Sequence, residues 1–220
     1  MNASMKALLV NGSPRGAFGC TARALAEVEK ELKKLHIDTD SYVVPKDIKH
    51  CINCRWCKTR NTFCVHDHQE FGELVDKING ADAIVFGSPV YYGGITSQLK
   101  ALLTRLLYSG PHTLEDKVVA GVFSSRRAGS TSAMSELNLF FLMHSCRIVG
   151  SQYWNEVHGD MPEEVELDAE GLQTMRTLAR NIEAMLSNRE FPDREHKIHT
   201  NFISREYLGL LKHDNELKGE

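Results

Sequence analysis

Residues 81–93 read Ala-Asp-Ala-Ile-Val-Phe-Gly-Ser-Pro-Val-Tyr-Tyr-Gly. The apolar run Ala83–Phe86 predicts a short buried strand, and Gly87-Ser88-Pro89 ends it. After the two tyrosines, leucines recur at helical spacing, at positions 99, 102, 103 and 106. The stretch therefore predicts a strand, a loop and a helix in succession, which is the repeating unit of a parallel sheet covered by helices.

The same unit recurs along the chain. Apolar runs predict four more strands, at residues 7–10, 41–44, 118–123 and 148–149. Amphipathic or apolar segments predict further helices, at residues 25–35, 71–78, 133–143 and 172–185. Five strands alternating with helices predict an α/β fold, in which a doubly wound, five-stranded parallel sheet carries helices on both faces.

We expect the chain to consist of two parts. Residues 1–187 contain every predicted strand and helix and form one domain, with a cysteine-rich loop at 51–64. Residues 188–220 are polar, charged and rich in histidine. They are expected to form a C-terminal extension that packs on the domain or on a neighbouring subunit, with a partly disordered tail as the alternative.

Composition narrows the class of protein. The 220 residues carry a formal net charge of −3 with both signs mixed throughout, so no electrostatic feature indicates nucleic acid as a partner. The apolar runs are far too short to span a bilayer, and residues 1–6 show no signal-peptide pattern. We expect a cytoplasmic protein, where a reducing environment makes clustered cysteines ligands or redox groups before disulfides.

The first loop that carries chemistry is Gly12–Thr21. Its small residues let backbone N–H groups approach an anion, Ser13 and Thr21 add hydroxyls, and the fork of Arg15 suits phosphate. The helix that starts near Thr21 points its positive end at the same place. The loop matches neither dinucleotide nor triphosphate fingerprints, so we expect a single phosphate; the alternative is an ordinary turn before a helix.

Two further strand-end loops are unusual. Residues 88–96 place Tyr91 and Tyr92 beside Gly93-Gly94 after a proline turn, which supplies stacking surface and exposed backbone for a flat ring. The alternative is a plain connection with the tyrosines inside the core. Residues 124–131, Ser-Ser-Arg-Arg-Ala-Gly-Ser-Thr, follow the fourth strand and are placed to close over the same pocket. The sequence does not decide whether the two arginines of this loop, Arg126 and Arg127, face solvent or a phosphate.

Four of the six cysteines fall in one short stretch, at positions 51, 54, 57 and 64. Thiolates at every third position can surround one small inorganic centre, and the spacing suits a [4Fe–4S] cluster. Zinc, with help from His50, His66 or His68, is one alternative, and free or disulfide-forming thiols are another. Cys20 and Cys146 are expected to pack as small apolar groups.

These motifs occur in a familiar order: Gly-Ser-Pro-Arg at 12–15, the cysteine run, the 81–93 stretch and then Gln98-Leu99-Lys100-Ala101. In that order they resemble the NADPH-dependent FMN reductase family, and within it the iron–sulfur flavoproteins, over roughly residues 6–186. The chain departs from the family at Cys20, where Asn is frequent, and its first loop is a residue longer than is common.

The resemblance implies a flavodoxin-like FMN-binding domain with strand order 2-1-3-4-5. It implies that the FMN phosphate is held by Ser13, Arg15, Cys20 and Thr21. It implies that the flavin ring is lined by Pro89, Val90, Tyr91, Tyr92 and Gly93, and bordered on the other side by Ser124, Ser125 and Gly129. The same likeness makes Cys51, Cys54, Cys57 and Cys64 the ligands of a [4Fe–4S] cluster and makes a homodimer or homotetramer the expected assembly.

The sequence therefore predicts an FMN-dependent oxidoreductase. The reductant is expected to be NAD(P)H or a ferredoxin-like protein, and no catalytic acid or base is assigned, because the flavin itself accepts hydride. A non-catalytic electron carrier that keeps FMN and the cluster is the first alternative. The second is a flavin reductase whose cysteine loop binds structural zinc or stays as free thiols.

Overall fold

The computed structural model describes residues 5–65, 68–110 and 113–188. The predicted C-terminal extension lies outside these residues, apart from Asn188. The strands are β1 (Lys6–Asn11), β2 (Asp38–Val43), β3 (Ala83–Pro89), β4 (Val118–Ser125), β5 (Arg147–Ile148) and β6 (Glu156–His158). The α-helices are α1 (Cys20–Lys34), α2 (Trp56–Arg60), α3 (His68–Asn79), α4 (Ser97–Ser109), α5 (Ser130–Met143), α6 (Pro162–Val165) and α7 (Ala169–Leu186).

The sheet is parallel and has the order β2-β1-β3-β4-β5, so the predicted strand order is confirmed. It also contains a strand that the sequence analysis did not predict. β5 pairs with the beginning of β4 and β6 pairs with its end, so the fifth place in the sheet is shared by two short segments. Of Glu156, Val157 and His158 only the valine is apolar, and this is too weak a pattern to indicate a strand.

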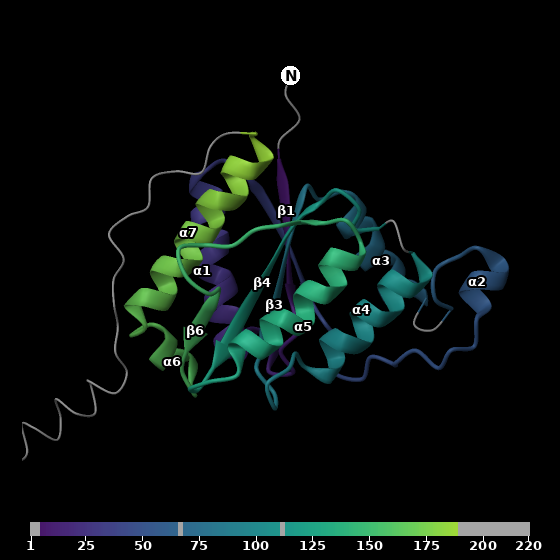
Figure 1. The fold of residues 1–220 in the computed structure, drawn as a ribbon, viewed down its shortest axis with the longest axis horizontal. Coiled ribbons are helices and arrows are strands. Elements are labelled where there is room, and N and C mark those ends of the chain that lie inside the picture. The colour runs from purple at the N-terminus through teal and green to yellow at the C-terminus, as the bar shows by residue number, and fades with distance from the viewer. Residues whose placement is uncertain (1–4, 66–67, 111–112, 189–220) are drawn as a thin grey trace, which may run out of the picture.

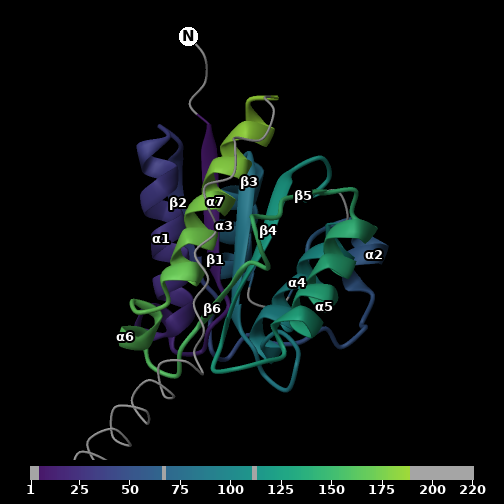
Figure 2. The same ribbon diagram turned by 60° about the vertical axis from the view of Figure 1, so that its left-hand side comes forward.

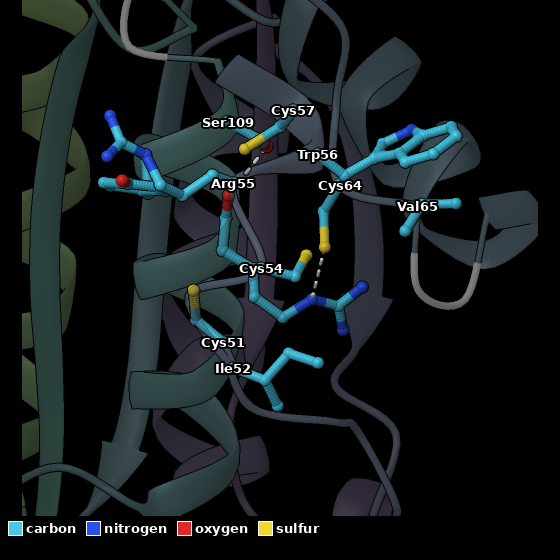
Figure 3. A pocket seen from close by; sticks show the side chains of 11 residues that line it. Cys51, Ile52, Cys54, Arg55, Trp56, Cys57, Cys64, Val65 and Ser109 are labelled. Carbon is cyan, nitrogen blue, oxygen red and sulfur yellow. Dashed lines mark hydrogen bonds between the residues drawn. The ribbon is translucent and has the colours of Figure 1, made fainter. Parts of the chain in front are cut away.

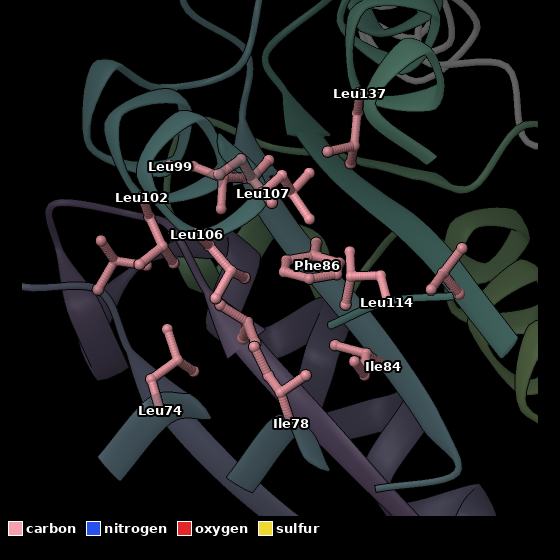
Figure 4. Close-up of a cluster of buried hydrophobic side chains, with 14 of the residues drawn as sticks. Leu74, Ile78, Ile84, Phe86, Leu99, Leu102, Leu106, Leu107, Leu114 and Leu137 are labelled. Atoms are coloured by element: carbon pink, nitrogen blue, oxygen red, sulfur yellow. The ribbon is translucent and has the colours of Figure 1, made fainter. Parts of the chain in front are cut away.

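Helices cover both faces of the sheet, as Figures 1 and 2 show. Alternate residues of the central strands point to opposite faces. Leu8, Val10, Ile84 and Phe86 pack with α3, α4 and α5, whereas Ala7, Leu9, Ala83 and Val85 pack with α1 and α7. Figure 4 shows Ile84 and Phe86 among the leucines of the first of these two cores. Helices therefore cover both faces of the central strands, which leaves the strand ends as the place where a ligand can approach the sheet.

One glycine sets how closely the first helix approaches the sheet. A Cβ atom on Gly87 in β3 would lie 2.7 Å from the Thr21 Cγ2 atom and 2.8 Å from the Leu25 Cδ1 atom. A side chain there would push α1 away from β3. The bare backbone thus keeps the start of α1 against the carboxyl edge of the sheet, beside the loop that precedes it.

In the described part of the chain, no helix combines the length and the apolar character that a bilayer crossing requires.

Candidate functional site

The first loop is organised by a residue that the sequence analysis did not single out. Asn11 ends β1, its Oδ1 atom accepts a hydrogen bond from the Ser13 N–H (2.9 Å), and its Nδ2 atom donates to the Gly16 carbonyl (3.0 Å). The Ser13 Oγ atom in turn accepts from the Arg15 N–H (3.2 Å). The signal in the sequence was an Asn directly before a Gly-Ser-Pro turn, a position where Asn side chains bond the local backbone.

The hydroxyls of the predicted phosphate site lie under the loop. Ser13 and Thr21 are buried, and the Thr21 Oγ1 atom is 2.8 Å from the Ser124 Oγ atom at the end of β4. This hydrogen bond joins the first loop to the third. Arg15 is exposed, and Gly16 and Cys20 are half-buried. Among these groups, the Arg15 side chain is therefore the one that is exposed, and it lies beside the start of α1.

The start of α1 has no side-chain cap. Its N-cap residue is Gly19, which offers no side-chain hydrogen bond to the first turn. The first N–H groups of any α-helix lack an intrahelical acceptor, and the helix dipole makes that end attractive to an anion. The Cys20 thiol donates to the Gly159 carbonyl (3.5 Å), and burial raises its pKa. Cys20 thus packs as a neutral thiol, as expected from the sequence.

The second loop is a tight turn that projects from the molecule. Tyr91 and Gly94 exchange two backbone hydrogen bonds of 3.0 and 2.9 Å. Between them Tyr92 and Gly93 have φ values of +51° and +76°, as in the two-residue turns of β-hairpins. Tyr92 is fully exposed and Tyr91 is 48% exposed. The alternative that both tyrosines belong to the core is therefore wrong.

The second and third loops touch because of one glycine. Gly129 precedes α5 with a φ of +96°, and a Cβ atom there would lie 2.9 Å from the Val90 Cγ1 atom and 3.2 Å from the Gly93 Cα atom. The Val90 N–H also donates to the Ser124 carbonyl (2.9 Å). The structure thus brings all three predicted loops to one edge, with Ser124 contacting both other loops.

A carboxylate on α5 fastens the second loop. The Glu136 Oε2 atom accepts from the Ile95 N–H (2.8 Å) and its Oε1 atom accepts from the Lys100 Nζ atom (2.6 Å). Burial raises the pKa of Glu136, but these two hydrogen bonds outweigh it, so the pKa lies below its usual value. The carboxylate is therefore charged at neutral pH, and its contribution to stability is lost only as the pH falls through that lowered pKa.

Replacing Glu136 with alanine is expected to lower the free energy of unfolding by about 1–2 kcal/mol, because the buried Ile95 N–H loses its acceptor. Glu136→Gln keeps an oxygen for that N–H and loses only the exposed ion pair with Lys100, which contributes little. Urea unfolding of the two variants checks this. Equal losses in both would contradict the role given to the Ile95 hydrogen bond.

A second network, also absent from the sequence analysis, lies behind the third loop. The Ser125 Oγ atom is 3.2 Å from the His158 Nδ1 atom and accepts a hydrogen bond from the Ser130 hydroxyl (3.1 Å). The His158 Nε2 atom is 3.7 Å from the Glu156 Oε1 atom. The hydrogen bond with Glu156 raises the pKa of His158, although burial opposes it, and the nearby Asp168 charge adds to the increase.

The raised pKa of His158 predicts a pH dependence of stability. The protonated ring is favoured in the folded state, so its stabilisation is fully present below the unfolded pKa of about 6.5 and is lost as pH rises through the higher folded value. We expect the melting temperature of the wild type to fall as the pH rises above about 6.5. The melting temperature of His158→Gln should fall less over the same pH range. Melting curves over a pH series test this, and identical slopes for both proteins would refute it.

The four clustered cysteines line one open hollow at the surface. Figure 3 shows Cys51, Cys54, Cys57 and Cys64 around it. The wall opposite the loop is formed by Arg105, Tyr108 and Ser109 at the end of α4. The loop curls around this helix end with three left-handed residues, Asn53, Arg55 and Asn61.

The thiols of this hollow are free in the structure, which pairs none of them in a disulfide. Within the described ranges no three Cys, His, Asp or Glu side chains come close enough together to hold a metal ion. His66 and the side chain of His68 lie outside what the structure describes, so the zinc alternative is not tested at those two residues. Four cysteines that line one hollow have the donor chemistry that an iron–sulfur cluster requires, and their thiols would have to move closer together to bind one.

Comparison with known proteins gives consistent matches. The sequence profile of the NADPH-dependent FMN reductase family matches residues 5–159. An iron–sulfur flavoprotein of Methanocaldococcus jannaschii is 32% identical over 188 residues, which cover 81% of this chain and 95% of the relative.

Solved structures share the fold. RosB, with a bound formylriboflavin phosphate intermediate, superposes with a TM-score of 0.68 at 16% identity and covers 90% of this chain and 92% of its own. A WrbA-like flavodoxin from Agrobacterium tumefaciens superposes with a TM-score of 0.62 at 17% identity, covering 85% and 100%. The fold is therefore flavodoxin-like.

Proposed function

Because the chain belongs to the NADPH-dependent FMN reductase family, we propose that it is a flavin-dependent oxidoreductase that carries both FMN and a [4Fe–4S] cluster. The family match supports FMN as the cofactor and oxidoreduction as the class of reaction. When bound, FMN takes up hydride or single electrons and the cluster takes up electrons singly. The protein supplies binding, orientation and access.

The FMN phosphate is proposed to lie over the start of α1. The exposed Arg15 side chain can donate charge-assisted hydrogen bonds to a phosphate, and the N–H groups at the start of α1, which have no side-chain cap, can donate further ones. Ser13 and Thr21 are proposed to act from below: their hydroxyls hold the Arg15 backbone and the end of β4 in place. Cys20 contributes its backbone to the same turn.

The flavin ring is proposed to rest against the 89–93 turn. Pro89 and Val90 lead into that turn, and the exposed rings of Tyr91 and Tyr92 offer apolar surface at its tip. Ser124, Ser125 and Gly129 border the turn from the third loop. Tyr92 projects fully into solvent, so this edge is open to a small molecule or to a partner protein.

The observation that supports the proposed cluster is the arrangement of the four cysteines. They come from fourteen consecutive residues, 51–64, and all four line the same hollow. Four thiolates within reach of one centre are what a [4Fe–4S] cluster requires. The named relative, an iron–sulfur flavoprotein, is consistent with this proposal.

One helix is common to both proposed sites. The 89–93 turn precedes the first residue of α4, and the cysteine hollow surrounds the end of α4 from Arg105 onward. At 1.5 Å per residue, Ser97 and Arg105 lie about 12 Å apart along the helix axis. The two sites are thus held at a fixed separation by a rigid element.

The electron donor and the assembly are further parts of the proposal. NAD(P)H is the donor that the family description suggests, and a ferredoxin-like protein is the alternative suited to a single-electron centre. Self-association as a homodimer or homotetramer is supported by three exposed apolar side chains on α5: Leu139, Leu142 and Met143. The cytoplasmic location and the absence of a nucleic-acid partner stay predictions.

Protein purified without oxygen provides the test. We expect visible flavin bands with a broad iron–sulfur shoulder, and reduction of a quinone or dye when NADPH or a reduced ferredoxin is added. Flavin bands without iron would reject the cluster and retain the reductase. Flavin and iron without turnover on any small acceptor would favour the electron carrier. Failure to bind added FMN would reject the whole proposal.

A further inference from the structure

The cysteine loop is attached to the body of the protein by an arginine that is almost completely buried. Arg105 belongs to α4, is 1% exposed, and is the largest of the fully buried side chains in the described part of the chain. Burying a guanidinium is costly unless its N–H groups and charge are satisfied. The groups that accept its hydrogen bonds therefore indicate the role of the buried charge.

Two of those neighbours are the two ends of the cysteine loop. The Arg105 Nη1 atom donates to the Lys49 carbonyl (3.1 Å), just before Cys51, and the Nε atom donates to the Cys64 Sγ atom (3.4 Å). Figure 3 shows the second hydrogen bond as a dashed line ending on Cys64. The guanidinium also lies 4.9 Å from the centre of the Phe71 ring on α3. One side chain thus connects the beginning and the end of the loop through a rigid helix.

The contact with Cys64 has a chemical consequence if that sulfur is a ligand. Positive charge and N–H hydrogen bonds at the ligand sulfurs are among the factors that set the reduction potential of an iron–sulfur cluster. Groups that contact the ligands, without being ligands themselves, also fix the ligands' orientation. Arginine suits this place, because its planar fork can donate in two directions while its charge is permanent.

We propose that Arg105 is the positioning residue of the cluster site: it closes the 49–64 loop and raises the reduction potential of the cluster through its charge and its hydrogen bond to Cys64. The proposal rests on the proposed function for the cluster, but the closure of the loop does not require iron. The two parts can therefore be measured separately.

Arg105→Met retains most of the side-chain volume and removes the charge and the donors. Arg60→Met is the matched control, because Arg60 is an exposed arginine of the same loop that stacks on Trp56 at 4.8 Å. Two quantities are measured in each protein: the hydrogen exchange of the loop amides by mass spectrometry, and the cluster potential by a redox titration followed by EPR.

We expect the amide hydrogens of residues 51–64 to exchange at least about tenfold faster in Arg105→Met than in the wild type. Loss of a hydrogen bond that contributes about 1.5 kcal/mol implies an increase of this size. We also expect the cluster potential of Arg105→Met to shift to more negative values, and by more than that of Arg60→Met. Amide exchange in residues 51–64 no faster than in Arg60→Met would overturn the loop-closing part of the proposal. A potential shift no larger than in Arg60→Met would overturn the tuning part.

A conservative variant guards against misfolding. Arg105→Lys keeps the positive charge but lacks the guanidinium fork that donates to both Lys49 and Cys64. The amide hydrogens of the loop should therefore exchange faster than in the wild type, while the cluster potential shifts less than in Arg105→Met. If Arg105→Met fails to fold, wild-type exchange in Arg105→Lys overturns the proposal. If the wild type binds no iron, the cluster proposal fails, and the exchange measurement alone then decides whether Arg105 closes the loop.

Discussion

Replacing Cys57 with alanine is expected to lower the iron content from about four atoms per chain to fewer than one, in protein prepared without oxygen. Cys57 lies on α2 and lines the same hollow as the other three thiols. Removing it leaves three thiolates for a cluster that needs four ligands. Iron analysis and the visible shoulder measure the loss. FMN content should stay the same, because the three flavin loops lie at the other end of α4.

The matched control is Cys146→Ala. The Cys146 thiol lies outside the loop, donates to the Leu114 carbonyl (3.4 Å) and has its pKa raised to about 11 by burial, so it is not a thiolate at neutral pH. Its removal should leave iron unchanged. Retention of four iron atoms in Cys57→Ala, or equal losses in both variants, would contradict the proposed ligand set.

Replacing Arg15 with glutamine is expected to weaken FMN binding about 10- to 150-fold, the equivalent of one charge-assisted hydrogen bond of about 1.5–3 kcal/mol. The side chain is exposed at the mouth of the first loop, next to the uncapped start of α1. Riboflavin, which lacks the phosphate, should bind equally to the variant and the wild type. Titration of flavin-free protein, followed by flavin fluorescence, gives both affinities.

Arg23→Gln is the control for loss of charge near α1. Arg23 is exposed in the first turn of the same helix, and its side chain lies 3.6 Å from the Glu166 carboxylate, with which it forms an ion pair. Its variant should bind FMN like the wild type. An Arg15→Gln variant that lost FMN and riboflavin affinity to the same extent would show that Arg15 shapes the loop and does not contact the phosphate.

The fold could be predicted because its central strands are apolar on both sides. Ala83–Phe86 and Val118–Phe123 are buried on both faces by helices, so each appears in the sequence as an uninterrupted apolar run. β6 could not be predicted from Glu156, Val157 and His158. The two polar residues are there because their side chains bond to each other and to Ser125, which is 33 positions away from His158 in the sequence.

The candidate site was predicted in its parts but not in its connections. Glycines, tyrosines and cysteines indicate loops with unusual chemistry, and the structure brings the three flavin loops together at one edge. The sequence gives no sign that Arg105 is buried, because an arginine among leucines on an amphipathic helix is expected to face solvent. Its role depends on contacts with Lys49 and Cys64, which only the tertiary structure creates.

The central claim is that the carboxyl edge of this sheet holds FMN by its phosphate. The most direct measurement compares the affinities of the flavin-free wild-type protein for FMN and for riboflavin under the same conditions. We expect FMN to bind at least about a hundredfold more tightly, because two charge-assisted hydrogen bonds to the phosphate contribute about 3 kcal/mol. Equal affinities for the two flavins, or no binding of FMN, would contradict the account.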